Sequence, residues 1–443
     1  MSEPPADAPP AGPLVGVRVV EMACIGPGPF AGMLLADMGA EIVRVDRPER
    51  VGGRRADADS HLVLDRGRRS IAVDLKHPDG PAVVMDLAAG ADVLIEGFRP
   101  GVMERLGLGP EAVLVRNPAL VYGRMTGWGQ DGPMASVAGH DINYISLAGA
   151  LEPTAAPDGG PPVPPLNMLG DFGGGGMLLA LGLVSALLHA RESGHGQVVD
   201  AAIVDGTALL TAMLHAMRFT GDWGSPRGAN LFDGGAPYYG VYRCADGGWL
   251  SAGAIEPKFY VQFAAGLGLA AELTPQAQHD RADWARQRAL VTAAIARRPR
   301  DEWVAVFAGT DACVTPVLAP DEVLSDPHLT ARAVFAGVDG LVQPEPAPRF
   351  SRTPGARRSA VPCVGEHTEA VLADFGFSPS AIAGLAKSGA VGQALGHQHQ
   401  HHPSLEEEAR ATWTLRELRH WSPAGPPGSA WPRSSGSPPP GRR

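Results

Sequence analysis

Residues 17–46 read VRVVEMACIGPGPFAGMLLADMGAEIVRVD, and this stretch decides the fold. Two runs rich in β-branched residues, 17–22 and 41–46, enclose a glycine-proline turn and an apolar helical pattern over 30–38. Strand, helix and strand at this spacing form a βαβ unit, whose strands are parallel because the helix returns the chain to the same end of the sheet. The stretch therefore predicts an α/β fold built on a parallel sheet.

The same alternation continues beyond this unit. Further strands are predicted at 70–75, 92–96, 120–125 and 198–204, and helices at 81–89 and about 175–191. Repeated βα units predict a large, Rossmann-like, doubly wound domain, which we place over residues 14–224.

The pattern changes near Trp223. Two strand patterns meet at Asp246-Gly247, a hairpin signal, and helical patterns follow at 257–267, 282–296 and 301–306. We expect a smaller α+β domain over 225–330 and a segment over 331–390 that returns to the large domain.

Both ends of the chain have a different composition. The leader 1–13 is rich in Pro and Ala, and the tail 391–443 is rich in Pro, Ser and Arg apart from a helical hint near 404–420. Neither segment has enough apolar side chains for a core, so we expect both to be disordered. Four histidines between 397 and 402 have no carboxylate or cysteine at ligand spacing, so no metal site is predicted.

The composition excludes several classes of protein. The chain has 443 residues, of which 44 % are hydrophobic, and a net charge of −10, which argues against a binder of nucleic acid or anionic membranes. Its four cysteines form no Cys-x-x-Cys pair, which indicates a reducing compartment. There is no signal peptide or C-terminal Ser-Lys-Leu, and the apolar run 177–187 is shorter than the roughly 18 residues of a membrane helix. We expect a cytoplasmic enzyme.

The turn Gly26–Ala31 fits the dinucleotide pattern G-x-G-x-x-A, and Asp46 stands where that pattern has its ribose-binding acid. That turn binds pyrophosphate through backbone N–H groups. Pro27 and Pro29 each lack one, so the sequence disfavours a nicotinamide cofactor.

Nine basic residues lie between Arg44 and Lys76. They form either a solvated loop, which we prefer for residues 50–55, or a site for a polyanion such as a nucleotide phosphate. Arg47, Lys76 and Arg99 are the better phosphate candidates, because each follows a predicted strand at the end where α/β folds bind ligands.

Two predicted helix starts carry reactive side chains. His140 and Asp141 precede one helical pattern, and Asp171 precedes another within the glycine-rich run 169–176. Both aspartates could be ordinary N-caps. Four consecutive glycines bring the backbone close to a neighbour or ligand, which favours a functional role for Asp171.

Together these motifs resemble the family III CoA-transferase (CaiB/BaiF-like) superfamily. The general resemblance is carried by Gly26–Pro29, Arg47-Pro48, Asp74–Lys76 and Glu96–Gly101. A closer resemblance to its α-methylacyl-CoA racemase branch is carried by Gly127–Gln130, Gly139–Ser146, Asn167–Gly176, Asp233–Tyr238 and Gly253–Pro257. The motifs stay in register from about Pro13 to Gly389.

The resemblance implies a large Rossmann-like domain, a smaller α+β domain and an interlaced homodimer. It implies that the enzyme interconverts (2R)- and (2S)-2-methylacyl-CoA thioesters by proton transfer through an enolate. His140 and Asp171 would be the acid/base pair, and Glu256 and Asn167 would orient them, with Glu256 supplied by the partner chain. N–H groups at the helix start Asp171–Gly176 would stabilise the enolate oxygen.

The resemblance also implies contacts with the CoA part of the substrate. These map onto Arg47, Val73, Asp74, Leu75, Lys76, Gly97, Phe98, Arg99, Arg105, Gly139, Asp141, Ile142, Asn143 and Tyr144. No metal and no separate cofactor is expected. The expected partners are an acyl-CoA substrate and a second copy of the chain, without nucleic acid or membrane.

Two alternatives remain open. In a CoA-transferase of the same superfamily, Asp171 would be a nucleophile that forms an acyl anhydride, and His140 distinguishes the two activities because transferases generally lack it. A CoA-binding scaffold without catalysis is the second alternative. Cys24, in the loop expected to face CoA, departs from the family pattern. Because the resemblance ends at Gly389, we expect truncation after that residue to leave activity intact.

Overall fold

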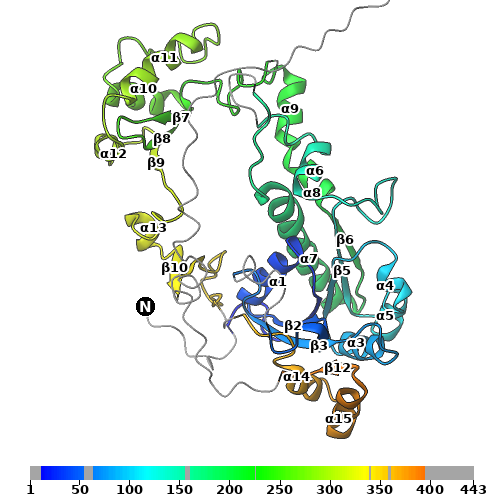
Figure 1. Cartoon of the computed structure of the whole chain (residues 1–443). Helices are drawn as coiled ribbons and strands as arrows, with labels where there is room; N and C mark the ends of the chain where they lie inside the picture. Colours follow the sequence, from blue (N-terminus) through cyan, green and yellow to red (C-terminus); the bar gives the residue numbers. More distant parts are fainter. Residues whose placement is uncertain are drawn as a thin grey trace, which may run out of the picture. The chain divides into compact units, whose positions relative to one another are not determined.

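A seven-stranded sheet lies at the centre of the predicted large domain (Figure 1). The computed structural model describes residues 11–53, 63–154, 160–224, 226–338, 341–357 and 361–394. The strand order is β12-β3-β2-β1-β4-β5-β6, with bounds β1 Arg18–Met22, β2 Glu41–Asp46, β3 Arg68–Val73, β4 Val93–Glu96, β5 Val121–Thr126, β6 Val198–Ala202 and β12 Val391–Gly392. Strands β1 to β6 pair in parallel and β12 pairs antiparallel with β3. The predicted parallel α/β sheet is confirmed.

The strand order reverses beside β1. The chain adds β2 and β3 on one side of β1 and then β4, β5 and β6 on the other. Open α/β sheets bind ligands at the carboxyl ends of the strands that flank such a reversal. The loops after β1 and β4, residues 23–26 and 97–101, therefore border the expected site.

Helices cover both faces of the sheet (Figure 1). One face carries α1 (Pro27–Asp37) and α7 (Leu178–Ser193), and the other carries α3 (Gly80–Ala89), α4 (Val102–Arg105), α5 (Pro110–Arg116), α14 (Thr368–Asp374) and α15 (Pro379–Ser388). Successive strand residues serve opposite cores: Val19 packs with α1 and α7, and Val20 packs with α3. Since α14 and α15 complete one core, the segment after residue 360 belongs to this domain.

A 26-residue apolar helix, Met168–Ser193, is long enough to cross a membrane by length and composition alone. It consists of a π-helical part, η2 (Met168–Met177), followed by α7. One such helix is weak evidence for a span, because core helices have the same composition. Its most apolar window is 44 % buried, and Leu179, Leu183 and Leu187 lie in the sheet core. The apolar run expected from the sequence, 177–187, was shorter because it excluded the glycines before Met177. In the structure the helix continues through these glycines.

Three short helices follow or pack against η2. These are α6 (Asp141–Leu147), α8 (Ile203–Leu210) and α9 (Ala212–Thr220). A Cβ at Gly206 of α8 would lie 1.8 Å from the Gly174 carbonyl oxygen of η2, so these two backbones touch. The close contact holds η2 in place beside the sheet.

A separate three-stranded antiparallel sheet forms in the predicted smaller domain. Its order is β7 (Tyr239–Arg243), β8 (Trp249–Gly253) and β9 (Val314–Val317), and it packs with α10 (Pro257–Gly266), α11 (Trp284–Ile295) and α12 (Arg300–Phe307). The expected hairpin is present, with Gly247 at φ +87° in the turn. Tyr238, Phe263 and Trp303 are among the buried aromatic residues of this core.

Two expected boundaries shift in the structure. Residues 11–13 were assigned to the leader, yet the chain packs there: a Cβ at Gly12 would lie 2.0 Å from the Met38 carbonyl oxygen. The tail was expected to begin at 391, which falls within β12. The other described elements are η1 (Pro48–Arg50), α13 (Pro327–Ala331), β10 (Phe335–Val338) and β11 (Leu341–Pro344). Residues 1–10, the histidine tract and the helical hint at 404–420 lie outside the described residues.

Candidate active site

The turn after β1 brings the start of α1 against η2. Gly26 has φ +70°, a left-handed conformation that glycine adopts without strain, and Pro27 begins α1. A Cβ at Gly26 would lie 3.3 Å from Asp171 Oδ2. The turn therefore borders the Asp171 carboxyl, and an added side chain would crowd it.

Asp46 argues against the dinucleotide interpretation of this turn. Its carboxylate accepts hydrogen bonds from Arg44 Nε at 2.8 Å and Ser70 Oγ at 2.6 Å. The residue is buried, with 3 % of its surface exposed. A ribose hydroxyl group has no access to this carboxylate.

Asp171 lies inside η2 and not at a helix start. The helix begins at Met168, three residues earlier, so Asp171 is not an N-cap. Asn167 Nδ2 donates a hydrogen bond to Asp171 Oδ2 at 3.3 Å. The Asp171 N–H donates to Asp141 Oδ1 at 2.7 Å. One side chain thus contacts the Asp171 carboxyl and another holds its backbone.

The surroundings of the Asp171 carboxyl raise its pKa. Burial raises its pKa, while the hydrogen bond from Asn167 lowers it; the charge of Asp141 adds to the rise, and that of His140 opposes it. The pKa remains above that of an ordinary aspartate. Asp171 can therefore both accept a proton and return one, as an acid/base catalyst must.

His140 precedes α6 and is exposed. Its backbone N–H donates to Asn143 Oδ1 at 3.0 Å, and its carbonyl oxygen accepts from the Asn143 N–H. These contacts fix the first turn of α6, and the charge of His140 acts on the Asp171 carboxyl, so the two residues are near each other. The structure brings His140, Asp171 and Asn167 together in one cluster.

The glycines after Asp171 serve helix packing. A Cβ at Gly174 would lie 2.7 Å from the Thr207 nitrogen, one at Gly175 3.0 Å from Pro27 Cβ, and one at Gly176 2.7 Å from Phe30 Cδ1. The close approach expected from four glycines is therefore to α1 and α8. This changes the expected oxyanion donors, because residues 171–176 lie within a helix and the Asp171 N–H already has an acceptor.

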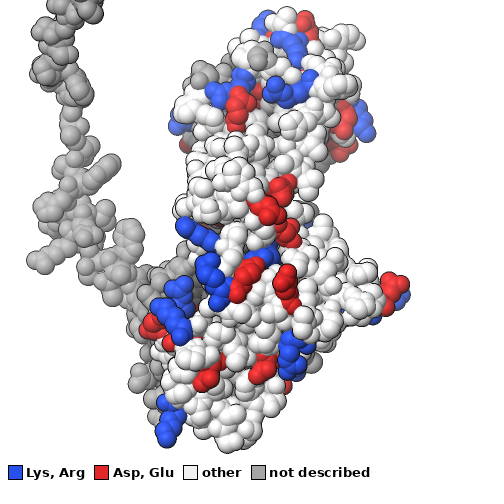
Figure 2. All heavy atoms as spheres, turned by 90° about the vertical axis from the view of Figure 1, so that its right-hand side faces the viewer, with Lys and Arg blue, Asp and Glu red and all other residues white. Residues whose placement is uncertain are grey.

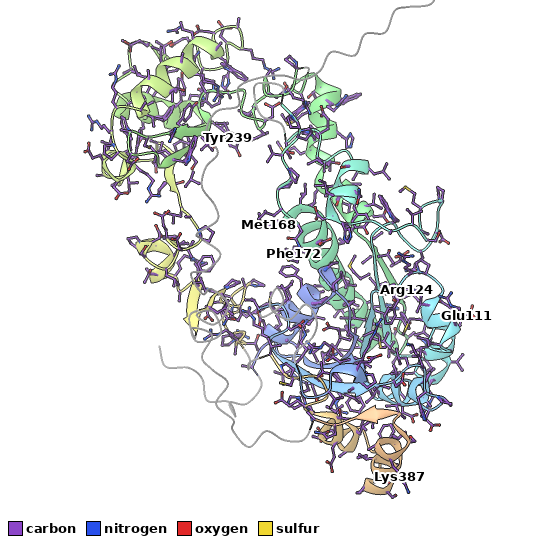
Figure 3. All side chains as sticks on the ribbon, viewed as in Figure 1. Glu111, Arg124, Met168, Phe172, Tyr239 and Lys387 are labelled. Atoms are coloured by element: carbon purple, nitrogen blue, oxygen red, sulfur yellow. The ribbon has the colours of Figure 1, made fainter. Side chains whose placement is uncertain are left out.

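Figure 3 shows Met168 and Phe172 directed to the side of η2 away from β5 and β6. Met168 is 56 % exposed, and the Phe172 ring packs at a tilt of 35° against Phe30 of α1, with ring centroids 4.8 Å apart. This side of η2 therefore presents an apolar surface next to Asp171.

The expected CoA contacts follow the carboxyl ends of β2, β3 and β4. Arg47, Lys76, Arg99 and Arg105 are exposed, as phosphate-binding groups must be. Around them, Asp74 Oδ1 accepts the Lys76 N–H at 2.9 Å, which fixes the loop after β3. Parallel strands end at one edge of a sheet, so these side chains share that edge.

Other expected CoA contacts have limited access. Val73 has 1 % of its surface exposed and Tyr144 has 8 %, so their side chains belong to the core. Phe98 is partly buried against the core, and its N–H donates to Glu96 Oε2 at 2.7 Å. Gly97 and Ile142 are exposed.

Part of the basic stretch is committed to internal ion pairs. Arg44 contacts Asp46 and Asp65, Arg66 contacts Asp37, and Arg68 contacts Glu21 at 3.0 Å. All three arginines are buried. They are not available to a polyanion, and the local excess of positive charge is smaller than the sequence suggested. Residues 54–62 lie outside the described residues.

The sequence profile of CoA-transferase family III matches residues 14–368. The chain belongs to CoA-transferase family III. Within this family, the alpha-methylacyl-CoA racemase of Mus musculus is 48 % identical over 376 residues, covering 84 % of this chain and 96 % of that protein. The enzyme of the same name from Homo sapiens is 45 % identical over 371 residues, covering 83 % and 95 %.

A solved structure shares the fold of this family III chain. The CAIB/BAIF family protein from Brucella suis has a TM-score of 0.70 at 28 % identity, and the match covers 82 % of this chain and 100 % of that chain. The α/β fold with a large parallel sheet, which the resemblance implies, is therefore shown by sequence and by structure.

Glu256, the fourth expected catalytic residue, belongs to the part of the chain that forms the three-stranded sheet. It precedes α10 next to the three-stranded sheet and is exposed. Burial raises the pKa of the Cys313 thiol, and the charge of Glu256 raises it further, so these two residues are neighbours. Among the described residues, no hydrogen bond or ion pair joins Glu256 to His140 or Asp171.

Two features of the site were missed in the sequence. Asp141 was expected to contact CoA or cap a helix, yet its carboxylate holds the Asp171 backbone 30 residues away. Tyr144 Oη donates to the Gly139 carbonyl oxygen at 2.5 Å, and its ring meets Trp128 edge-on at 4.7 Å. These contacts fix the loop that carries His140, and no local sequence pattern predicts them.

A cavity of about 620 Å³ opens elsewhere on the large domain. It is lined in part by Glu104, Glu111, Arg124, Gln130 and Asp200. Figure 3 labels Arg124 and Glu111. Arg124 is paired with Glu104 and with Glu96, so the lining is acidic overall and unsuited to phosphate groups. Figure 2 shows basic and acidic side chains interspersed on the side that bears α4 and α5.

Proposed function

We propose that this chain is a racemase that interconverts (2R)- and (2S)-2-methylacyl-CoA thioesters. The observation that carries the proposal is the pairing of His140 with an Asp171 carboxyl whose pKa is raised. A 1,1-proton transfer needs a base on one face of C2 and an acid on the other. Two relatives at 48 % and 45 % identity carry the racemase name, which supports the same activity here.

In one direction, a neutral His140 removes the proton from C2. The C–H electron pair moves into the C2–C1 bond and the carbonyl π pair moves to oxygen, which gives a planar enolate. The protonated Asp171 then delivers its proton to the opposite face of C2, and the carbonyl re-forms. The enzyme is left with a protonated His140 and an ionised Asp171, and these are the groups that the reverse reaction needs.

The enolate oxygen needs N–H donors. The expected donors at Asp171–Gly176 are largely used inside η2. The first turn of α6 begins beside His140, and its first N–H groups have no acceptor within the helix. We therefore assign the stabilisation of the enolate oxygen to the backbone N–H groups of Asp141 and Ile142 at the start of α6.

The CoA part would lie along the carboxyl ends of β2 to β4. Arg47, Lys76, Arg99 and Arg105 would bind its phosphates, while Val73 and Tyr144 would contribute backbone or core contacts. The acyl chain would lie on the apolar side of η2 near Met168. Proton transfer of this kind needs no redox group or metal, so we expect no cofactor besides the CoA of the substrate.

A homodimer is part of the proposal. Large apolar side chains are exposed along α7 and on α8 and α9, including Leu181 (63 %), Leu188 (72 %), Leu209 (65 %), Met213 (60 %) and Phe219 (92 %). A second copy would cover them and could supply Glu256 to His140. Light scattering of the active protein tests this: we expect a dimer, and a monomer with full activity would contradict it.

The decisive experiment is ¹H NMR of one epimer of a 2-methylacyl-CoA in D2O, without an acceptor acid. We expect loss of the α-proton signal together with formation of the other epimer. The H140A variant should lose this activity by about 10²- to 10⁴-fold, the usual contribution of an acid/base group.

The same samples distinguish a CoA-transferase, in which Asp171 would attack the thioester. Wild-type protein that exchanges no α-proton, yet moves CoA to an added carboxylic acid, would replace the racemase proposal by this alternative. Protein that binds acyl-CoA and does neither would be a scaffold.

A further inference from the structure

Asp141 has an unusual position for a residue in a ligand-binding loop. It is the first residue of α6, and only 8 % of its surface is exposed. Its Oδ1 accepts the Asp171 N–H at 2.7 Å. Its Oδ2 is buried and has no hydrogen-bond partner among the residues that the structure describes. A buried carboxylate with one unsatisfied oxygen lowers the stability of the fold, so stability alone does not account for its presence here.

The chain leaves room for this carboxylate. A Cβ at Gly170, the residue before Asp171, would lie 2.4 Å from Asp141 Oδ1 and 2.9 Å from Asp141 Cγ. Any side chain at this position would push the carboxylate away from the Asp171 N–H. The absence of a side chain at Gly170 therefore allows Asp141 of α6 to bind the backbone of η2 at Asp171, the proposed proton carrier.

The Asp141 charge also acts on the Asp171 carboxyl. It raises the pKa of Asp171 in addition to burial, against the hydrogen bond from Asn167 and the charge of His140. Tyr144 of α6 also lies near Asp171: burial raises the pKa of the Tyr144 hydroxyl, and the charge of Asp171 raises it further. The residues of α1 and its preceding turn that touch η2 lie within Gly26–Phe30, and those of α8 are Ile203, Gly206, Thr207 and Leu210; none of them brings a charge.

We propose that Asp141 is a positioning residue for Asp171. Its Oδ1 fixes the Asp171 backbone, and its negative charge keeps the adjacent carboxyl able to hold the proton that the reaction returns. The inference rests on the proposed racemase function and assigns to the Asp141 side chain a task separate from CoA binding.

Two substitutions separate these two tasks. D141N keeps an acceptor oxygen and removes the charge, whereas D141A removes both. The productive form of the enzyme holds one proton on the pair of His140 and Asp171. The low-pH limb of the kcat/KM profile, here called the acid limb, therefore reports the loss of one proton from the doubly protonated pair. We expect D141N to move this limb to lower pH, because it lowers the pKa of Asp171. D141A should in addition lower kcat roughly tenfold to a hundredfold, as expected for loss of a charged acceptor, with little change in KM.

Two further variants complete the set. G170A keeps both charges but displaces the carboxylate from the N–H, so it should lower kcat and leave the acid limb in place. D205N is the matched control, because it removes an exposed carboxylate from α8 and should change neither quantity. Should D141A fail to fold, D141N and G170A still carry the test.

A readout without turnover separates this inference from the proposed function. Carbodiimide labelling of Asp171, followed by peptide mass spectrometry across pH, reports the protonation of its carboxyl in free enzyme. We expect a lower midpoint in D141N than in wild type and D205N. An unchanged midpoint, with wild-type kcat in D141A, would overturn the inference while racemase activity stands. Wild-type protein without α-proton exchange would instead refute the function, and the labelling result would still decide the role of Asp141.

Discussion

At Asp171 the proposed catalytic role and the stability of the fold make opposite demands. Burial and the Asp141 charge raise the pKa of its carboxyl. In the pH interval between its unfolded-state pKa and this raised value, the folded protein binds more protons than the unfolded chain. Stability therefore falls as pH rises through that interval. Below the unfolded-state pKa both states are protonated, and the effect disappears.

This balance predicts the behaviour of D171N. The variant should lose racemase activity and have a higher Tm than wild type at neutral pH, because it no longer ionises in a buried place. The difference should shrink near about pH 4, where an unfolded aspartate is half protonated. Thermal unfolding at both pH values measures it, with D205N as the control at an exposed site. A D171N protein that melts below wild type at neutral pH would contradict the raised pKa.

At the scale of elements, buried ion pairs connect the strands to the loop beneath the site. Arg68 of β3 pairs with Glu21 of β1 and donates to the carbonyl oxygen of Pro29 in α1. Arg68 and Glu21 are both almost fully buried. Removing one partner would leave the other charge buried without compensation.

We therefore predict that R68A lowers the free energy of unfolding by about 3–5 kcal/mol, measured by urea denaturation. The matched control is R116A, which breaks the exposed pair of Arg116 with Asp86. That change should stay within about 0.5 kcal/mol, as for most exposed pairs. Equal losses in R68A and R116A would show that burial of the pair is unimportant.

The contact between η2 and α8 gives a second prediction at this scale. Because a Cβ at Gly206 would overlap the Gly174 carbonyl, G206A should force the helices apart and lower Tm and kcat together. Gly384 is the control, since it lies in the middle of α15 with open space around it. G384A should raise stability by roughly 0.5–1 kcal/mol without changing kcat. A G206A variant with wild-type kcat would show that η2 does not depend on this contact.

Local sequence patterns predicted correctly the helices and strands whose residues alternate or repeat clearly. The runs at 17–22 and 41–46 correspond to β1 and β2, and the turn at Asp246-Gly247 to the β7–β8 hairpin. β9 was missed because it contains Pro316, which an edge strand paired only with β8 tolerates. β12 was missed because two residues make no pattern.

The sequence identified residues of the candidate site, but it did not predict their contacts with one another. His140, Asp171 and Asn167 were named from motifs, and the structure brings them together. The bond from the Asp171 N–H to Asp141 joins residues 30 positions apart, and spacing alone does not reveal it. The glycine run suggested a ligand at the backbone, because sequence cannot distinguish a ligand from a neighbouring helix.

At the scale of the whole molecule, the last described residues hold the sheet edge nearest the expected CoA site. Val391 and Gly392 pair with β3, and the Asp74 N–H donates to the Ala390 carbonyl oxygen at 2.9 Å. Thr368 Oγ1 donates to the Gly392 carbonyl oxygen at 2.6 Å. The loop after β3, with its exposed lysine, therefore depends on residues beyond 389.

These contacts revise the expectation that truncation after Gly389 is harmless. We predict that a chain ending at Gly389 melts roughly 5 °C or more below the full chain, because it loses β12 and several buried hydrogen bonds. Its KM for acyl-CoA should rise, since the Asp74–Lys76 loop is no longer held. A chain ending at Ala394 keeps β12 and is the matched control, with the Tm, kcat and KM of the full chain. Differential scanning fluorimetry and initial-rate kinetics on the three chains measure these quantities. If both truncated chains behave alike, β12 does not support the CoA-binding edge, and the residues after 389 are dispensable as the motif pattern alone suggested.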